Sequence, residues 1–257
     1  MDVPRFHLDA PLTTGLHVEL SQAEAHHAVH VLRLRAGDAI ELFNGRGEVA
    51  AGRIVLAKHG WASCEVGAVE AAKSRPGPGI HVAFAVPKGK RLDWLLEKAT
   101  ELAAASLTPV AFERSVAGGE DLEGAKRERW LGHCIAAAKQ SGLNFLPELR
   151  ESQTLTTLLA VTTADADAGT LRRLAGDLTD DSVPLTDALA GAPADASAGP
   201  AADILLIVGP EGGFSDAERR QLAAARVTPV RLGQTILRIE TAAIALLAAA
   251  TALAGAR

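Results

Sequence analysis

Residues 203–222, DILLIVGPEGGFSDAERRQL, constrain the fold more than any other segment of the chain. The run DILLIV, residues 203–208, has almost no polar alternation, which is typical of a parallel strand that is covered on both faces. Ser215 and Glu218 have the spacing of a capping box and predict the start of a helix. A buried strand, a tight turn and a helix form the repeating unit of an α/β fold.

The turn between this strand and helix consists of Gly209, Pro210, Glu211, Gly212 and Gly213. Three glycines give up side-chain packing and backbone entropy. In open parallel sheets, ligands bind at the carboxyl ends of strands, and a helix N-terminus there favours a carboxylate or phosphate. The simpler alternative is a turn that only needs positive φ. Neither GxxxxGK[ST] nor GxGxxG is present, which excludes the usual nucleotide-binding loops.

The second part of the chain alternates strand-like and helix-like patterns, which predicts a mainly parallel α/β sheet. The expected strands are 80–87, 107–112, 203–208 and 227–233, and the expected helices are 91–105, 125–141 and 240–254. Segment 161–202 is rich in Ala, Asp, Gly and Pro, so we expect mostly loop around a weak strand at 170–176. The last helix is apolar nearly all round, which predicts burial in the domain or in a subunit interface.

The first part of the chain is predicted to be β-rich. Residues 39–57 contain two strand-like runs around Asn44-Gly45, a hairpin signal. Before them, Ser21 and Glu24 suggest a capping box that opens a helix over 21–34. The segment KSRPGPGI, residues 73–80, is predicted to be a linker. We therefore expect two domains, 1–72 and 77–257.

Composition limits the partners and the compartment. Apolar residues make up 48% of the chain, which is enough for a sizeable core. Because the net charge is −5, a nucleic-acid contact must come from a local basic patch. The first residues do not resemble a signal peptide, and the apolar stretch 241–254 is too short to span a bilayer, so we expect a cytoplasmic protein without membrane contact. His26 and His30 lie on one helical face without further metal ligands, which favours a structural or RNA-facing role and no metal.

A second glycine turn precedes the last helix. The segment VRLGQTILRIETAAIALL, residues 230–247, follows a predicted strand and brings Arg238 and Glu240 to the helix start. The two charges could be an ordinary surface pair, which contributes little to stability. They are also the best candidates for catalytic charges, because the helix behind them offers almost no polar face.

Several segments spread along the chain resemble one enzyme family. LLIVGPEGGFSDAE and LGQTILRIETAA strongly resemble the RsmE-type enzymes, which are bacterial 16S rRNA uridine N3-methyltransferases of the SPOUT superfamily. The segments VPRFHL, HHAVHVLRLRAGD, EKATEL, FERSV and AAAKQSGLNFLPEL match further blocks of the family. The resemblance extends over nearly the whole chain.

The resemblance implies a PUA-like β-barrel followed by a SPOUT α/β domain with a C-terminal trefoil knot. It implies a homodimer that methylates N3 of a uridine in 16S rRNA of the small ribosomal subunit, with S-adenosyl-L-methionine as cofactor. The positions that match the family's cofactor-binding segments are Gly209, Pro210, Glu211, Gly212, Gly213, Leu232, Gly233, Ile236, Leu237, Arg238 and Thr241.

Methylation of uracil N3 needs a proton acceptor, because this nitrogen carries a proton, and a group that stabilises charge on the uracil oxygens. We expect Arg238 to face those oxygens, and Glu240 to orient Arg238 or to accept the proton. Glu211 is the rival base. Arg114, in FERSV, is a further catalytic candidate, supplied within the site or across the dimer.

RNA contacts are expected from local cations, each of which could also be an ordinary solvated charge. The candidates are Arg5, Arg33 and Arg35 in the first domain, and Lys88, Lys90 and Arg91 in the segment KGKR.

The chain departs from the family pattern at five positions near these segments. Lys139 replaces an acid, Leu143, Phe145 and Thr235 replace arginines, and Ile239 replaces a threonine. The changes leave two alternatives open: a SPOUT methyltransferase that acts on another nucleotide, and a non-catalytic RNA-binding protein of ribosome assembly.

Overall fold

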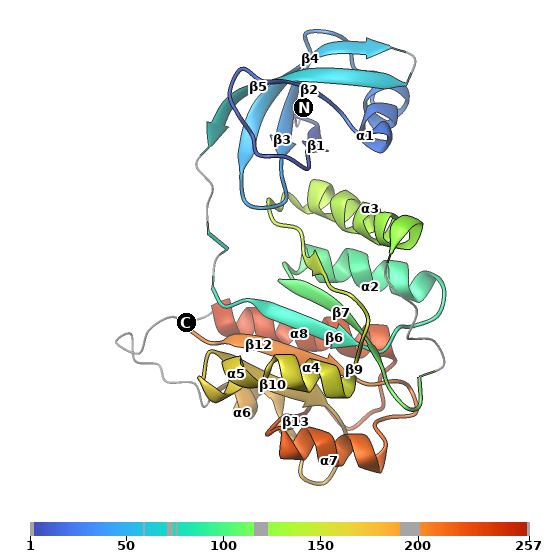
Figure 1. Ribbon diagram of the computed structural model, residues 1–257, viewed down its shortest axis with the longest axis vertical. Coiled ribbons are helices and arrows are strands. Elements are labelled where there is room, and N and C mark those ends of the chain that lie inside the picture. The colour runs from blue at the N-terminus through green and yellow to red at the C-terminus, as the bar shows by residue number, and fades with distance from the viewer. Residues whose placement is uncertain are drawn as a thin grey trace. The chain divides into compact units, whose positions relative to one another are not determined.

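The computed structural model describes residues 3–58, 60–70, 74–75, 77–115, 123–190 and 201–255. The chain forms two compact units (Figure 1), which are described separately. The first comprises Met1–Arg75 together with Ala138–Leu146, and the second comprises Pro76–Ala137 together with Pro147–Arg257. The segment 138–146, which the sequence analysis assigns to the second domain, thus groups with the first unit. Part of the expected linker, including Lys73 and Pro76, lies outside the described residues.

The first unit is built on a five-stranded sheet of order β1-β3-β4-β5-β2, in which β1 is parallel to β3 and the other pairs are antiparallel. The strands are β1 (Arg5–His7), β2 (His17–Glu19), β3 (Ala39–Phe43), β4 (Val49–Lys58) and β5 (Trp61–Glu70). The hairpin predicted at Asn44-Gly45 joins β3 to β4. Its loop is longer than two residues, and Gly45 and Gly47 adopt φ of 74° and 101° in it.

The helix predicted over 21–34 is shorter and irregular. It consists of α1 (Gln22–His26) and a π-helical turn, η1 (His27–Val31). The Ser21 hydroxyl accepts a hydrogen bond from the Glu24 amide at 3.3 Å, as the capping-box pattern predicts. The Glu24 carboxylate does not complete the box, because it accepts instead from the His7 amide (3.3 Å) and from Lys139 Nζ (2.8 Å).

Arg5 is a structural residue of the first unit. Its side chain is 12% exposed and pairs with the Glu41 carboxylate. The same guanidinium donates to the carbonyl oxygens of Ala138 (3.0 Å) and Leu143 (3.2 Å) and to the side chain of Asn144. The donors of Arg5 are therefore engaged inside the unit, which gives Arg5 a structural role there, and the RNA contact predicted for it stays a prediction.

Three family departures pack inside the same unit. Leu143 lies against a buried cluster that includes Phe43 and Val49, and the Arg75 guanidinium lies 5.1 Å from the centre of the Phe145 ring. Lys139, which stands where the family has an acid, forms the ion pair with Glu24 described above. In this chain the three side chains therefore make contacts inside the unit. Arg33 and Arg35, by contrast, are exposed.

Stability of the first unit is expected to fall in mild acid. Burial lowers the pKa of His7, and burial together with the Lys139 charge lowers the pKa of His27, both from 6.5. Below pH 6.5 the unfolded chain therefore binds more protons than the folded chain does. The free energy of unfolding is thus higher above that pH and decreases as the pH falls. Thermal unfolding between about pH 7.5 and about pH 5.5 checks this. His27→Gln should flatten the dependence, and an unchanged dependence in that variant contradicts the assignment.

The second unit contains an eight-stranded sheet in which every pairing is parallel, as predicted. The order is β11-β13-β10-β12-β6-β7-β8, and β9 pairs with β7. The strands are β6 (Ile80–Phe84), β7 (Ser106–Ala111), β8 (Glu148–Leu149), β9 (Gln153–Thr154), β10 (Leu171–Gly176), β11 (Val183–Pro184), β12 (Asp203–Val208) and β13 (Thr228–Arg231). The helices are α2 (Lys90–Glu101), α3 (Gly124–Ser141), α4 (Leu155–Val161), α5 (Thr163–Asp167), α6 (Leu185–Ala190), α7 (Asp216–Ala224) and α8 (Ile239–Gly255).

The predicted strands and helices of this unit are confirmed, including the weak strand, which is β10. The expectation of mostly loop over 161–202 is wrong for its described part. Helices α5 and α6 form there, and α6 buries Leu185 and Leu189. Residues 191–200 lie outside the described residues.

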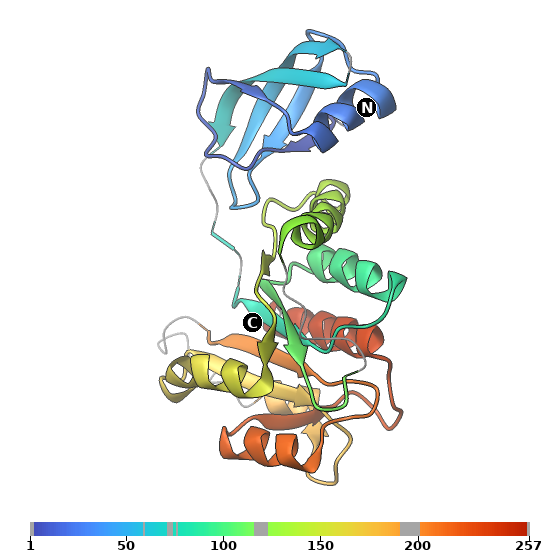
Figure 2. The same ribbon diagram turned by 45° about the vertical axis from the view of Figure 1, so that its right-hand side comes forward.

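Helices cover both faces of the sheet (Figures 1 and 2). Helix α8 packs on β6 and β12 and contacts α2 and α6, whereas α4 and α5 lie on the opposite face. The central strands β6 and β12 are almost wholly buried, which explains their continuous apolar sequences. The trefoil knot stays a prediction of the resemblance, because strand order does not define how the chain threads.

Candidate functional site

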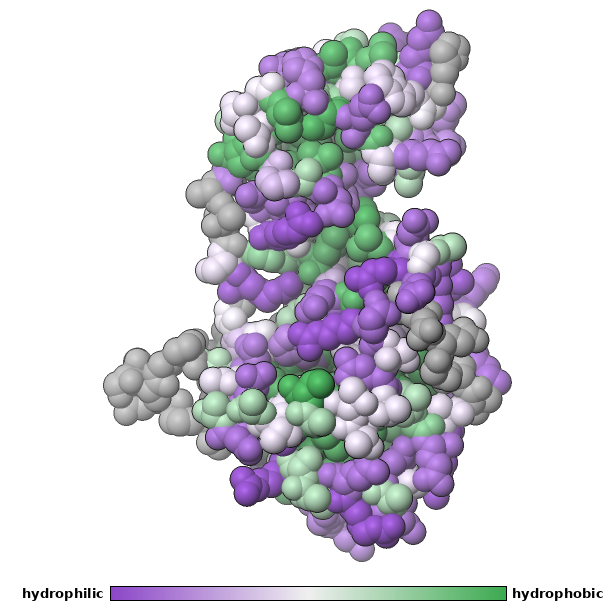
Figure 3. All heavy atoms as spheres, viewed as in Figure 1, coloured by the Kyte–Doolittle hydropathy of each residue, from purple (hydrophilic) through white to green (hydrophobic). Residues whose placement is uncertain are grey.

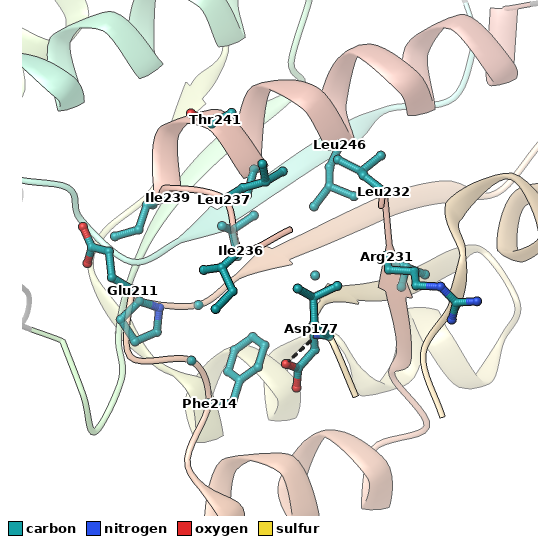
Figure 4. Close-up of a pocket in the computed structure, with 18 of the residues that line it drawn as sticks. Asp177, Glu211, Phe214, Arg231, Leu232, Ile236, Leu237, Ile239, Thr241 and Leu246 are labelled. Atoms are coloured by element: carbon teal, nitrogen blue, oxygen red, sulfur yellow. Dashed lines mark hydrogen bonds between the residues drawn. The ribbon is translucent and has the colours of Figure 1, made fainter. Parts of the chain in front are cut away.

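A pocket of about 590 Å³ opens at the carboxyl ends of β10, β12 and β13, beside α8 (Figure 4). The glycine turn after β12 and the loop 232–237 after β13 form two of its walls. All the positions predicted to bind cofactor line this pocket except Arg238. Figure 4 shows Glu211 and Ile239 at one end and Arg231 at the other. The two glycine turns, separate in sequence, thus border one cavity.

The three glycines of the turn differ in their backbone conformation and in the space around them. Gly213 has a φ of 67°, and its amide donates to the Pro210 carbonyl at 2.8 Å, so this position needs the left-handed conformation. A Cβ on Gly209 would lie 2.9 Å from the Phe214 ring. A Cβ on Gly212 would meet the Arg114 side chain at 3.4 Å. Positive φ therefore accounts for Gly213 and the Phe214 ring accounts for Gly209, whereas the 3.4 Å at Gly212 is an ordinary van der Waals distance and gives no such reason.

The start of α7 fixes the far side of the turn. The predicted second capping box is present: Ser215 Oγ accepts from the Glu218 amide (3.2 Å), and the Glu218 carboxylate accepts from the Ser215 amide (2.7 Å). The same carboxylate also accepts from the Glu113 amide at 2.8 Å. The FERSV segment is thereby tied to the helix that follows the glycine turn.

Arg114 supports the turn from that segment. Its Nη1 donates to the Gly212 carbonyl at 2.8 Å, and it also lies 3.4 Å from the Phe214 carbonyl oxygen. Arg114 does not line the pocket. In this chain Arg114 thus supports the glycine turn, and the catalytic role predicted for it stays a prediction.

Sequence reasoning missed a carboxylate on the pocket wall. Asp177 follows β10, and its largely buried side chain accepts from Arg219 Nε at 2.9 Å, which raises the pKa of Arg219. The sequence analysis predicts the strand before Asp177 but does not single out Asp177 itself, because the surrounding segment 161–202 is predicted to be mostly loop. The available signal was its place after a weak strand, since neighbouring parallel strands end at one edge of the sheet.

Three charged side chains gather at the Glu211 end of the pocket. Arg91 Nη1, on α2, lies 3.3 Å from Glu211 Oε1 and 3.9 Å from Glu240 Oε2. Glu240 is 7% exposed, and its Oε2 is buried without a hydrogen-bond partner. Arg238 is exposed and is absent from the pocket lining. The structure therefore pairs Glu240 with Arg91 rather than with Arg238.

A second, smaller pocket of about 250 Å³ adjoins this corner. It shares Pro210, Glu211 and Ile239 with the large pocket. Its remaining lining residues are Ala85, Val86, Lys88, Arg91 and Ser115. Of the predicted RNA-contacting cations in the KGKR segment, Lys88 and Arg91 line it, whereas Lys90 is exposed outside it.

The described residues contain neither a cluster of metal ligands nor a helix that could span a membrane. Within the described parts of the chain, no three or more His, Cys, Asp or Glu side chains are grouped to hold a metal ion. In the same residues, none of the helices has the length and hydropathy needed to cross a bilayer. In the view of Figure 3, hydrophilic side chains are spread over both units.

Comparison with known proteins identifies related sequences along nearly the whole chain. A family model described as an RNA methyltransferase domain matches residues 75–251, and one described as an RNA methyltransferase PUA domain matches residues 20–66. Two curated relatives carry the name ribosomal RNA small subunit methyltransferase E. The Bacillus subtilis protein is 30% identical over 88% of this chain and 86% of its own length, and the Synechocystis protein is 32% identical over 92% and 73%.

Solved structures give the same result. A putative methyltransferase from Legionella pneumophila, in complex with the cofactor SAM, has 30% identity and a TM-score of 0.81, and 98% of each chain is covered. The small subunit rRNA methyltransferase E of Neisseria gonorrhoeae, bound to S-adenosyl methionine, has 29% identity and a TM-score of 0.80 at the same coverage.

The fold and the matches define an RNA methyltransferase with a parallel α/β methyltransferase domain and a PUA-like domain, which confirms the predicted α/β class and domain order. The SPOUT superfamily, like the trefoil knot, stays a prediction of the resemblance. The chain belongs to the family whose curated members are named ribosomal RNA small subunit methyltransferase E.

Proposed function

We propose that this protein transfers a methyl group from S-adenosylmethionine to N3 of a uridine in 16S rRNA of the small ribosomal subunit. The observation that carries the proposal is the pocket of about 590 Å³ that the two glycine turns border, at the strand ends where ligands of α/β sheets bind. Two structural neighbours of about 30% identity are described with this cofactor bound.

The residues of the large pocket fit such a cofactor. Apolar side chains such as Leu237, Ile239 and Leu246 suit an adenine ring, and exposed backbone of the glycine turn offers hydrogen bonds. The carboxylate of Asp177 suits a hydroxyl or ammonium group. S-adenosylmethionine supplies an activated methyl group on a positively charged sulfur.

Glu211 is the best-placed proton acceptor for the uracil nitrogen. Its side chain is 44% exposed and lines both pockets, whereas Glu240 is buried and lines neither. A positioned general base contributes roughly 10²–10⁴-fold to a rate. Arg238 is exposed beside the site, so we assign it a contact with the RNA outside the pockets.

The remaining partners are also proposals. Arg33, Arg35 and Lys90 are exposed and are proposed to contact RNA phosphates, whereas Lys88 lines the small pocket. A cytoplasmic homodimer is proposed, in which α8 contributes its partly exposed apolar residues to the interface.

The test uses purified protein, methyl-labelled S-adenosylmethionine and small ribosomal subunits that lack the modification. We expect label in 16S rRNA, and nucleoside digestion with mass spectrometry should identify 3-methyluridine. Label in another nucleoside would support the reading as a methyltransferase with a different target. Absence of label with cofactor binding intact would support the non-catalytic assembly protein.

A further inference from the structure

The small pocket has the position required of a substrate subsite. It shares the wall of Pro210, Glu211 and Ile239 with the large pocket, so groups bound in the two lie next to each other. Its volume of about 250 Å³ lies below the roughly 300–1,000 Å³ of pockets that hold drug-sized ligands, which favours a single heterocyclic ring over a whole nucleotide.

The charged groups of this pocket complement an imide base. Lys88 and Arg91 provide donors for two carbonyl oxygens, and Glu211 provides an acceptor for the N–H between them. A phosphate would also attract both cations, but it would face the Glu211 carboxylate at close range. The lining therefore favours a neutral imide over a phosphate.

Arg91 stands between two carboxylates that differ in their surroundings. In the protein described here it is hydrogen-bonded to the partly exposed Glu211, and it lies 3.9 Å from the Glu240 oxygen. That Glu240 oxygen is buried and lacks a partner, which is costly for a carboxylate. Arg91 has five N–H donors and can satisfy Glu240 by a small movement of its side chain.

We propose that the small pocket receives the target uracil, with Lys88 and Arg91 on its oxygens, and that Glu240 positions Arg91 so that Glu211 is free to accept the N3 proton. This inference rests on the proposed function. In the step, the N3–H proton passes to Glu211, and the electron pair of N3 forms the bond to the methyl carbon. The carbon–sulfur bond breaks, and its electron pair stays on a neutral thioether sulfur.

The kinetic test compares Arg91→Ala, Glu240→Gln and the double variant, on unmethylated small subunits with saturating S-adenosylmethionine. We expect Arg91→Ala to lower kcat by about 100-fold, with the Kd for S-adenosylmethionine within about threefold of the wild type. The double variant should be no slower than Arg91→Ala, because Glu240 acts through Arg91. Additive losses, or an unchanged kcat in Arg91→Ala, would overturn the proposal.

The variant Arg91→Lys tests whether a loss of kcat in Arg91→Ala results from misfolding. It keeps the charge but not the planar fork, so it should fold as the wild type does and should also lose kcat, because one ammonium group cannot pair with Glu240 and contact the uracil oxygen in the geometry of the guanidinium. Full activity in Arg91→Lys would contradict the positioning of Arg91 by Glu240.

A binding test does not depend on turnover. Saturation-transfer NMR with uridine, in the presence of S-adenosylhomocysteine, should show contact with the wild type, and Lys88→Ala should lose it. Ribose 5-phosphate is the competing probe. A signal from ribose 5-phosphate and none from uridine would overturn the base assignment in favour of a phosphate site.

The two proposals fail in different ways. If the wild type transfers no methyl group to any nucleoside, the proposed function and this inference both fall. If it produces 3-methyluridine while Arg91→Ala or Lys88→Ala keeps wild-type kcat and uridine binding, only the subsite assignment falls.

Discussion

Glu211→Gln is expected to lower kcat for methylation of small subunits by roughly 10²–10⁴-fold, the usual contribution of a positioned general base. The amide keeps the shape of the side chain and its place in the glycine turn, but it cannot take up the proton. Because a proton acceptor is needed only in the chemical step, the KM for both substrates should change little. Steady-state kinetics with labelled S-adenosylmethionine provides the measurement.

Glu101→Gln is the matched control for this variant. Glu101 pairs with Lys98 on α2 and lines neither pocket, so its loss should leave kcat near that of the wild type. A Glu211→Gln protein with at least half the wild-type kcat would remove Glu211 as the base. Weakened cofactor binding with unchanged kcat would instead make Glu211 a cofactor ligand only.

Lys139→Met is expected to destabilise the first unit by about 3–5 kcal/mol, the usual effect of removing one partner from a buried ion pair. Lys139 Nζ lies 2.8 Å from Glu24, and the two side chains are 14% and 9% exposed. Nζ also donates to His27 Nδ1 at 3.0 Å. Methionine matches the length of lysine but leaves the Glu24 carboxylate without this partner. Denaturant unfolding of the variant measures the loss.

Lys98→Met is the control for Lys139→Met. It makes the same substitution on a helix, but the Lys98–Glu101 pair is 37% and 29% exposed, so the expected cost is about 0.3–0.5 kcal/mol. A second test adds Glu24→Gln to Lys139→Met, which removes the uncompensated charge and should recover part of the loss. Equal destabilisation by Lys139→Met and Lys98→Met would show that the Glu24–Lys139 pair contributes no more than a surface pair.

Local sequence patterns were enough to predict many of the strands and helices of the second unit. The apolar run 203–208 and the Ser215–Glu218 spacing predicted β12 and the start of α7, because burial on two faces and helix capping are properties of neighbouring residues. The composition of segment 161–202 predicts mostly loop, whereas α6 forms there with Leu185 and Leu189 buried, a tertiary contact that composition does not reveal.

The spacing of charged residues in the sequence is not enough to predict which of them interact. Arg238 and Glu240 are two positions apart, yet their side chains differ, since one is exposed and the other is buried near Arg91 of another helix. Arg5 looked like a free cation in sequence, but its partners lie more than a hundred positions away at Ala138 and Leu143. No local pattern contains such distant partners.

The sequence by itself determined the alternation of buried strands and helices, the two glycine turns and the resemblance to one enzyme family, because these depend on short-range order. Only the tertiary structure decided which charges meet. It brought Arg91 to Glu211 and Glu240, which come from three separate elements, and it engaged Arg5 and Lys139 within the first unit. The physical reason is that ion pairs and pocket walls depend on distance in space, which the packing of the sheet and its helices sets.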